Sequence, residues 1–228
     1  MTERAYTPPL GFAALTPLYD RAVRVMTREA AWRTCLVDRI DARKGETVLD
    51  VGSGTGSLAI AVTAAAPGCI FKGIDPDSAA VELARDKAAR AGSSATFEQG
   101  SFNGLATHED DVVDKITCSL VLHQVRLAEK RRLLRAMFDR LRPGGQLFIA
   151  DYGFQPTFVM RLAFRLTVQM LDGRNDTQPN ADGILPALIE EAGFERTRIL
   201  DRFDTATGTI DIIRAERPGA AHLMEQQR

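Results

Sequence analysis

The segment Val48-Leu49-Asp50-Val51-Gly52-Ser53-Gly54-Thr55-Gly56-Ser57 decides the fold. A short run of strand-forming residues leads into three glycines at alternate positions, and the stretch 57–66 that follows has the composition of a helix. Glycines let a backbone turn tightly and approach a ligand closely, and the first turn of a helix has unpaired N–H groups. The order strand, glycine loop, helix predicts the ligand-binding turn of an α/β sheet.

Short apolar runs alternate with helical patterns along the rest of the chain. The expected strands are Thr47–Val51, Ile70–Ile74, Thr96–Glu98, Lys115–Ser119 and Gln146–Ala150, and the expected helices between them are Ser57–Ala66, Ser78–Ala91 and Leu127–Leu141. This alternation with right-handed crossovers predicts a doubly wound α/β sheet of parallel strands. A later helix, Ile184–Ala192, precedes the strand-like runs Arg196–Phe203 and Gly208–Ala215, which are close enough to form a hairpin. We therefore expect the parallel sheet to end in an antiparallel pair.

Length and charge bound the domain organisation and the class of partner. The chain has 228 residues, 45% of them hydrophobic, with 29 Lys and Arg against 30 Asp and Glu. This length suits one domain with a sizeable core, for which we expect a helical cap at 1–44, a ligand-binding domain at 45–216 and a flexible tail at 217–228. A dedicated nucleic-acid binder usually carries a large basic excess, so nucleic acid is not an expected partner.

Other features indicate a cytoplasmic protein without a metal site. The first residues lack the apolar core of a signal peptide, and no uncharged apolar run approaches the roughly 20 residues that span a bilayer. Three scattered cysteines cannot all pair, which fits a reducing compartment. The three histidines stand far apart and no carboxylates cluster, so no metal is expected.

Two acidic residues narrow the ligand of the glycine loop. Asp50 precedes the first glycine by two residues, and Ser57 stands where a dinucleotide-binding fingerprint has its third glycine. A carboxylate at this place would repel a pyrophosphate but suits a ligand with an amino group and a sulfonium, so the loop favours S-adenosylmethionine over NAD. Asp75, at the end of the second strand, is placed to bind ribose hydroxyls, as in both ligand classes. The alternative is an ordinary tight turn with a helix cap.

Residues 45–152 resemble the class I S-adenosylmethionine-dependent methyltransferases, and the terminal hairpin is similar to that family's final antiparallel strand. The resemblance implies a seven-stranded Rossmann-like sheet. Ser119-Leu120-Val121-Leu122 replaces the Asn/Asp-Pro-Pro-Tyr type motif of nucleic-acid and protein methylating relatives, which shifts the acceptor toward a small molecule. Tyr19-Asp20, Trp32, Gly54-Thr55-Gly56 and the stretch 119–125 look most like the ubiquinone/menaquinone C-methyltransferase group.

The resemblance also implies a cofactor site for S-adenosylmethionine. Its residues fall into four groups: Asp50, Gly52, Ser53, Gly54, Thr55 and Gly56 for the methionine part, Asp75 with Pro76 for the ribose, Ser101 and Phe102 for the adenine, and Ser119 and Leu120 at the centre.

Three residues are candidates for catalysis. His123 follows the fourth strand, where the acceptor is expected to approach, and would serve as a base if the acceptor must lose a proton. Its alternative is a histidine that caps a loop by hydrogen bonding. Tyr19 in the leading helical region and Tyr152 after the fifth strand are secondary candidates, for which packing is the simpler interpretation. Asp151 is an adjacent base or a helix cap.

The helical stretch 157–171 is unusually apolar. Arg161, Arg165 and Gln169 share one narrow face, and most other positions are apolar. The simpler interpretation is a buried lid helix. The alternative is a roof over a hydrophobic acceptor that also touches a membrane or a second subunit. We expect methyl transfer to a small apolar or aromatic acceptor, against two alternatives: a non-catalytic S-adenosylmethionine-binding protein and an NAD-dependent oxidoreductase.

Overall fold

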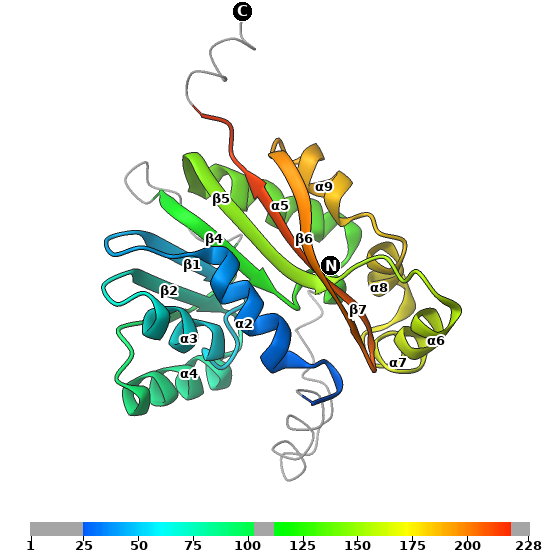
Figure 1. Ribbon diagram of the computed structural model, residues 1–228, viewed down its shortest axis with the longest axis horizontal. Coiled ribbons are helices and arrows are strands. Elements are labelled where there is room, and N and C mark those ends of the chain that lie inside the picture. The colour runs from blue at the N-terminus through cyan, green and yellow to red at the C-terminus, as the bar shows by residue number, and fades with distance from the viewer. Residues whose placement is uncertain (1–24, 103–111, 220–228) are drawn as a thin grey trace, which may run out of the picture.

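The computed structural model describes residues 25–102 and 112–219, which form a seven-stranded sheet (Figure 1). The strand order is β3-β2-β1-β4-β5-β7-β6. Four neighbouring pairs are parallel, and β7 is antiparallel to both β5 and β6. The strands are β1 (Thr47–Val51), β2 (Ile70–Asp75), β3 (Thr96–Gln99), β4 (Val113–Ser119), β5 (Leu141–Tyr152), β6 (Glu195–Thr205) and β7 (Gly208–Glu216). The expected doubly wound sheet with a terminal antiparallel strand is confirmed.

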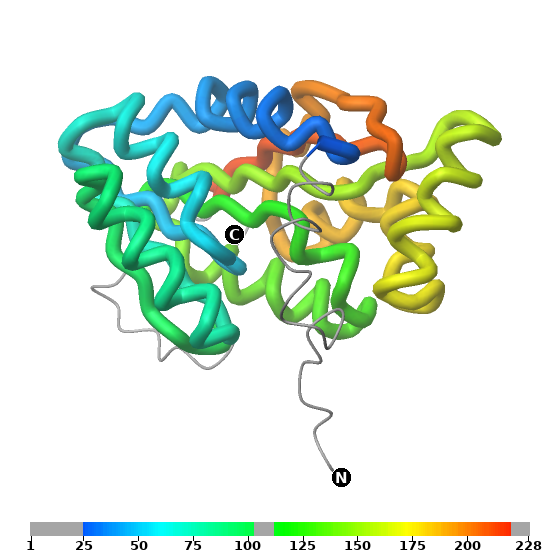
Figure 2. The backbone as a smooth tube through the Cα atoms, turned by 90° about the horizontal axis from the view of Figure 1, so that it is seen from below, coloured from blue at the N-terminus to red at the C-terminus, as the bar shows by residue number. Residues whose placement is uncertain are grey.

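Helices cover both faces of this sheet, and Figure 2 shows α2 and α5 on opposite sides of it. One apolar cluster joins α2, α3 and α4 to one face, and another joins α5 and α9 to the other. The helical elements are α2 (Glu29–Ile40), α3 (Ser57–Ala65), α4 (Ser78–Ala91), the 3₁₀ turn η3 (Leu122–Gln124), α5 (Leu127–Arg140), α6 (Phe158–Leu166), α7 (Val168–Asp172), α8 (Arg174–Ala181) and α9 (Leu185–Glu191).

The central strand shows why the apolar run before the glycine loop forms a buried strand. Successive side chains of a strand point to opposite faces. Val48 accordingly packs in the cluster on one face of the sheet and Leu49 in the cluster on the other. Because helices cover both faces, a continuous apolar run is needed there instead of an alternating one. The carboxyl ends of β1 and β4 are thereby held side by side, with Val51 opposite Cys118.

Local signals set the bounds of most elements. Asp77 caps α4, its carboxylate accepting from the Ala79 N–H at 2.9 Å, and Gly92 ends that helix with a φ of 64°. α2 belongs to the core, because Trp32 and Leu36 are buried in the same cluster as α3. The division into a cap and a domain stays a prediction.

Three expectations about elements differ from the structure. α5 ends at Arg140 and β5 begins at once at Leu141, ahead of the expected strand start at Gln146. There the backbone N–H of Gly144 donates to the Arg217 carbonyl at 3.0 Å, and the flexible tail at 217–228 stays a prediction. The stretch 157–171 is two helices, because the chain turns at Thr167 with a φ of −113° and a ψ of −79°. The polar segment that follows contains α8, whose Thr177 and Asn180 are buried.

Within the ranges that the structure describes, no helix combines the length and apolar character required to cross a membrane.

Candidate active site

The glycine loop is held open by hydrogen bonds from the end of the second strand. The N–H groups of Gly52 and Ser53 both donate to the Ile74 carbonyl, at 2.9 and 3.0 Å. The Gly54 N–H donates to Asp75 Oδ2 at 2.8 Å, and Asp75 Oδ1 accepts from the Asp77 N–H at 2.9 Å. Asp75 therefore links the loop to the start of α4.

Two of the loop glycines are required for different reasons. Gly52 has a φ of +74°, and a Cβ there would stand 2.3 Å from a methyl carbon of Val121. Gly54 has a φ of +50°, but a Cβ there would meet no atom within 4 Å. Open space beside a backbone that only glycine adopts easily is the geometry of a loop that lets a ligand come close. Gly52 is thus needed for packing, and Gly54 borders the site.

A cavity of about 370 Å³ lies over this loop, at the carboxyl ends of β1, β4 and β5. Its volume is that of an ordinary small-molecule site. Eight of the residues expected to form the site line it: Gly52, Ser53, Gly54, Thr55, Ser119, Leu120, His123 and Tyr152. Further walls come from α2, α7 and the β6–β7 turn, through residues including Trp32, Arg33, Leu171, Asp172 and Thr207. The cavity is therefore closed by elements from both ends of the described chain.

Asp50 lies at the end of β1 and is buried. Its Oδ1 accepts a hydrogen bond from the Thr117 hydroxyl at 2.6 Å. Burial raises the pKa of this carboxyl to about 6, although the Thr117 hydrogen bond and the charge of Arg33 oppose that rise. A cationic ligand group near this carboxylate would favour its ionised form.

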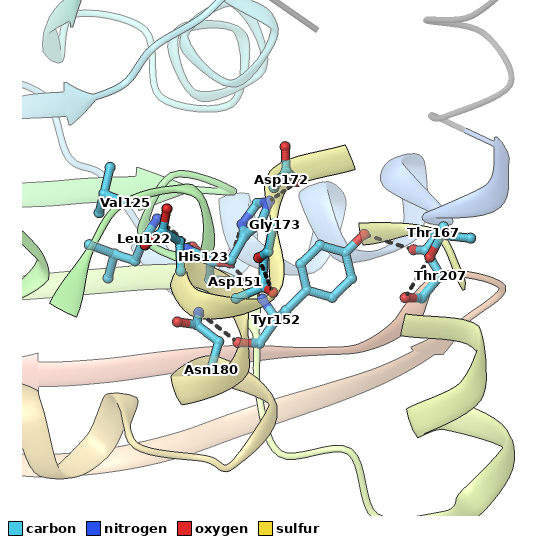
Figure 3. A network of polar contacts seen from close by, with 12 residues as sticks. Leu122, His123, Val125, Asp151, Tyr152, Thr167, Asp172, Gly173, Asn180 and Thr207 are labelled. Atoms are coloured by element: carbon cyan, nitrogen blue, oxygen red, sulfur yellow. Dashed lines mark hydrogen bonds and ion pairs between the residues drawn. The ribbon is translucent and has the colours of Figure 1, made fainter. Parts of the chain in front are cut away.

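His123 lies at the wall of the cavity between two carboxylates (Figure 3). Its Nδ1 lies 2.7 Å from Asp151 Oδ1, and its Nε2 lies 3.6 Å from Asp172 Oδ2. The Tyr152 ring meets the imidazole edge-on, with centroids 4.9 Å apart. The histidine is buried, whereas the Asp172 side chain keeps 22% of its surface exposed. His123 is therefore held by a hydrogen bond, as a structural histidine would be, and it also borders the cavity, as a base would.

Asp151 holds the imidazole in place and caps the turn that carries it. Its Oδ2 accepts from the backbone N–H groups of Leu122 at 2.7 Å and His123 at 3.3 Å, and its Oδ1 accepts from the Tyr152 N–H at 2.7 Å. With the imidazole also in contact, this buried carboxylate is fully occupied. Asp151 thus lies within β5 and binds the η3 turn from there, whereas the next helix is capped by Thr157; with its oxygens engaged, Asp151 is not free to act as a base.

Burial alone would disfavour the charged imidazole, but the charge and hydrogen bond of Asp151, with a further contribution from Asp172, outweigh it. The pKa of His123 is raised to about 9. A simple histidine titrates near 6.5, so the histidine in this cavity is a cation at neutral pH.

The remaining expected residues fall into three groups. Tyr152 is buried, and its hydroxyl lies 2.7 Å from Thr207 Oγ1, which satisfies the packing interpretation while one side of its ring borders the cavity. Gly56 is the N-cap residue of α3 and does not line the cavity. Asp75, Pro76, Ser101 and Phe102 lie at the β2–β3 side, also without lining the cavity, and Phe102 is packed in the core. Tyr19 lies outside the described residues, so its role stays a prediction.

The backbone of Leu120 is unusual. Its φ is +54°, a value that leucine rarely adopts, and its N–H donates to the Ala150 carbonyl at 2.9 Å. Strained backbone of this kind collects at functional sites. Leu120 directly follows β4 and lines the cavity next to Ser119.

Sequence reasoning missed three residues of the site. Asp172 ends the apolar stretch directly before Gly173, which was the only local signal for it. Lys87 in α4 donates to the hydroxyls of Thr55 at 2.9 Å and Ser57 at 2.8 Å, and places a positive charge beside the glycine loop. Lys130 of α5 is completely buried, and it donates to the carbonyls of Leu122, Val125 and Asp176.

Known proteins match both this fold and this loop. A family model described as a methyltransferase domain matches residues 48–145. The chain is 31% identical over 160 residues to a demethylmenaquinone methyltransferase of Deinococcus radiodurans, covering 69% of this chain and 65% of that protein. It is 30% identical over 169 residues to the ubiquinone/menaquinone biosynthesis C-methyltransferase UbiE of Geotalea daltonii, covering 70% of this chain and 68% of that protein.

The chain belongs to the class I S-adenosylmethionine-dependent methyltransferases. The fold agrees: the apo structure of the S-adenosylmethionine-dependent methyltransferase SibL superposes with a TM-score of 0.66 at 19% identity, over 94% of this chain and 63% of that one. Membership decides against the NAD-dependent oxidoreductase alternative, and the cofactor is S-adenosylmethionine.

The methyltransferase cavity contains polar atoms that fit this cofactor. Among the described residues, the buried Ser53 Oγ and Trp32 Nε1 have no hydrogen-bond partner, and both residues line the cavity. Buried polar groups without partners are rare in folded proteins and mark places where a ligand supplies the missing bond. Together with the open space at Gly54, they form a site for a ligand that carries polar groups, while Asp50 lies buried behind the loop and does not itself line the cavity.

Proposed function

We propose that this methyltransferase transfers a methyl group to a small aromatic acceptor that bears a hydroxyl group, such as a reduced quinone. The placement of His123 carries the proposal, since an imidazole between two carboxylates borders the cavity opposite the glycine loop. The two relatives, a demethylmenaquinone methyltransferase and a ubiquinone/menaquinone biosynthesis C-methyltransferase, support the same acceptor class. The match spans about two thirds of their length.

The cofactor half of the cavity would bind by charge and by backbone contacts. We assign the methionine part to Asp50, Ser53 and the loop 52–56. Beside the cavity, we assign the ribose to Asp75 with Pro76, and the adenine to Ser101 and Phe102. S-adenosylmethionine, when bound, supplies a methyl group on a positively charged sulfur that leaves as a neutral thioether. The chain's main contribution is to hold the acceptor in line with that methyl group and to exclude water, through Trp32, Tyr152 and Leu171.

His123 would remove the proton of the acceptor hydroxyl. Nδ1 is occupied by Asp151, so Nε2 is the nitrogen that faces the cavity and Asp172. In its neutral form Nε2 accepts the proton, and the two carboxylates stabilise the imidazolium that forms. Loss of the proton makes the acceptor ring electron-rich and lets it attack the methyl group. Tyr152 and the expected Tyr19 are assigned to the acceptor's surroundings, not to proton transfer.

The balanced charge of the chain supports a small molecule and not a nucleic acid as partner. The free thiols of Cys35, Cys69 and Cys118 fit the reducing conditions of a cytoplasm, where we place the protein.

The test is acceptor-dependent release of S-adenosylhomocysteine by the purified chain, with simple phenols and reduced naphthoquinones as acceptors. We expect turnover with hydroquinones, and a loss of about 10²–10⁴-fold in single-turnover rate for His123→Ala at saturating cofactor. Added imidazole should restore part of that loss, because a proton acceptor is replaced while a lost structural contact is not. No release with any acceptor would favour the non-catalytic alternative, and an unchanged His123→Ala rate would leave positioning as the only mechanism.

A further inference from the structure

The helices α6 and α7 turn large apolar side chains outward. Six of them are exposed, and Phe158 and Met170 keep 79% and 76% of their surface. We call this set the α6–α7 apolar face: Phe158, Val159, Leu162, Leu166, Met170 and Leu171. The simpler expectation from the sequence, a lid helix that buries its apolar residues, is therefore wrong. Contiguous exposed apolar surface of this kind marks an interaction site in soluble proteins.

The pattern along α6 is that of an amphipathic helix whose apolar side faces solvent. Phe158, Leu162 and Leu166 recur every fourth residue and lie on one side. Phe164 lies on another side and is buried in the core, so the helix is anchored from beneath. In Figure 1 both helices stand at one end of the molecule, beyond the sheet. The exposure thus belongs to a well-packed helix and not to a frayed end.

Arginines border the apolar face. Arg161, Arg165 and Arg174 line a hollow between α6 and α8, in which Asp182 is the one acidic lining residue. Arg161 donates to the Gln155 carbonyl at 3.0 Å. Arg165 and Arg174 have no ion-pair partner within the described parts of the chain. α6 itself contains no acidic residue. Apolar side chains beside cationic ones fit the boundary between the acyl chains and the phosphate groups of an anionic bilayer.

The apolar face also continues into the active-site cavity. Leu171 is half exposed on the face and lines the cavity, next to Val168 and Asp172 of the same short helix. An apolar molecule that leaves a membrane at this face would meet α7 first and then His123.

We propose that the methyltransferase docks on anionic lipid bilayers through the α6–α7 apolar face, with Arg165 and Arg174 contacting lipid phosphates. A bilayer fits better than a second copy of the chain, because a two-fold contact would place this face against itself and bring like-charged arginines together. Docking is peripheral, as none of the described helices is long enough to span. It goes beyond the proposed reaction and does not depend on the acceptor.

The experiment is co-flotation of the full chain, without cofactor or acceptor, with two kinds of vesicle. One kind is phosphatidylcholine alone, and the other also contains phosphatidylglycerol. We expect binding to the anionic vesicles that falls with added salt, and weak binding to the neutral ones. Phe158→Ser with Met170→Ser should lower binding more than tenfold, on the order of the transfer energy of two large apolar side chains. Arg165→Gln with Arg174→Gln should lower it about 25-fold, about fivefold for each charge.

Matched controls come from α4, at the other end of the sheet. Leu83 is 46% exposed and Arg90 is an exposed arginine, so Leu83→Ser and Arg90→Gln should leave flotation unchanged. Unchanged thermal melts of the double variants would show that they fold, because all four altered side chains are exposed. The proposal is overturned if the wild type floats with neither vesicle, or if the double variants float like the controls. It is also overturned if the chain is a dimer that Phe158→Ser with Met170→Ser dissociates, since the face would then join two copies.

Discussion

At the scale of single residues, the charge of His123 depends on the two carboxylates beside it. Asp151 is buried in contact with Nδ1, and Asp172 approaches Nε2 from the cavity wall. With a pKa of about 9, only about 1% of the histidine is neutral at pH 7. Because Nε2 must be unprotonated to accept a proton, the two carboxylates lower the fraction of catalytically competent enzyme at neutral pH.

The single-turnover rate should therefore rise about tenfold per pH unit and level off near pH 9, instead of near 6.5. Asp172→Asn removes one of the two negative charges and should move the midpoint to lower pH. Rates of the wild type and of Asp172→Asn across pH 6–10 test this. A flat rate profile over that range would contradict the role of the neutral imidazole.

The raised pKa of His123 also makes the stability of the fold depend on pH. Because the folded pKa is raised, the contribution of His123 to folding is fully present below about 6.5 and is lost as pH rises through about 9.

Gly54 and Gly92 have similar backbone conformations, so valine variants at the two positions distinguish the loss of ligand contact from backbone strain. Gly54 and Gly92 have φ values of +50° and +64°, and a Cβ at either would meet no atom within 4 Å. Gly54→Val and Gly92→Val should both destabilise the fold by about 1–2 kcal/mol, because both place a side chain in the left-handed region. Only Gly54→Val should abolish binding of S-adenosylhomocysteine in calorimetry. Equal affinities in the two variants would place the cofactor away from this loop.

At the scale of elements, Lys130 of α5 joins three segments around His123. Its ammonium donates to the carbonyls of Leu122, the first residue of η3, and of Val125 just after η3, and to the Asp176 carbonyl of α8. Burial lowers the pKa of this amine to about 8, although the charges of Asp151 and Asp176 oppose that shift. A buried cation is tolerated here because three acceptors surround it.

Lys130→Met keeps the length of the side chain but removes these bonds. We expect a loss of about 2–4 kcal/mol in the free energy of unfolding, because three buried carbonyls lose their donor. Turnover should also fall, since η3 carries His123. Arg131→Met, one residue along the same helix in an exposed pair with Glu191, should change stability by less than about 0.5 kcal/mol. Chemical denaturation of both variants measures the difference, and equal midpoints would show that α8 and η3 hold without Lys130.

At the scale of the whole molecule, the cavity is built from segments spread along the chain. Trp32 of α2, the loop after β1, the ends of β4 and β5, and the β6–β7 turn all contribute walls. A ligand bound there contacts elements that belong to one cooperative fold, so binding and folding are coupled.

S-adenosylmethionine or S-adenosylhomocysteine at a hundredfold excess over its Kd should add about 2.7 kcal/mol to the free energy of unfolding. For a chain of this size the melting temperature should rise by about 5–10 °C. NAD should leave it unchanged, because Asp50 would oppose a pyrophosphate. Scanning calorimetry with each ligand tests this, and a rise with NAD alone would contradict the cofactor.

The amino-acid sequence by itself determined the sheet, the position of the glycine loop and the cofactor class. These features depend on local physics: the period of apolar residues, the φ values open to glycine, and the acid at Asp50 all act within a few residues of the chain. Eight of the expected site residues line the cavity because the carboxyl ends of parallel strands meet at one edge of the sheet.

Only the tertiary structure decided the environment of His123 and the exposure of α6. Asp151 and Asp172 reach the imidazole from β5 and α7, and Lys130, which a helical pattern places on the polar face, is buried because α8 packs over it. The apolar residues of α6 predict burial by their composition, yet that helix lies at the end of the sheet, where Phe164 alone is buried. Such outcomes depend on which segments meet in space, and a local pattern contains no information about distant neighbours.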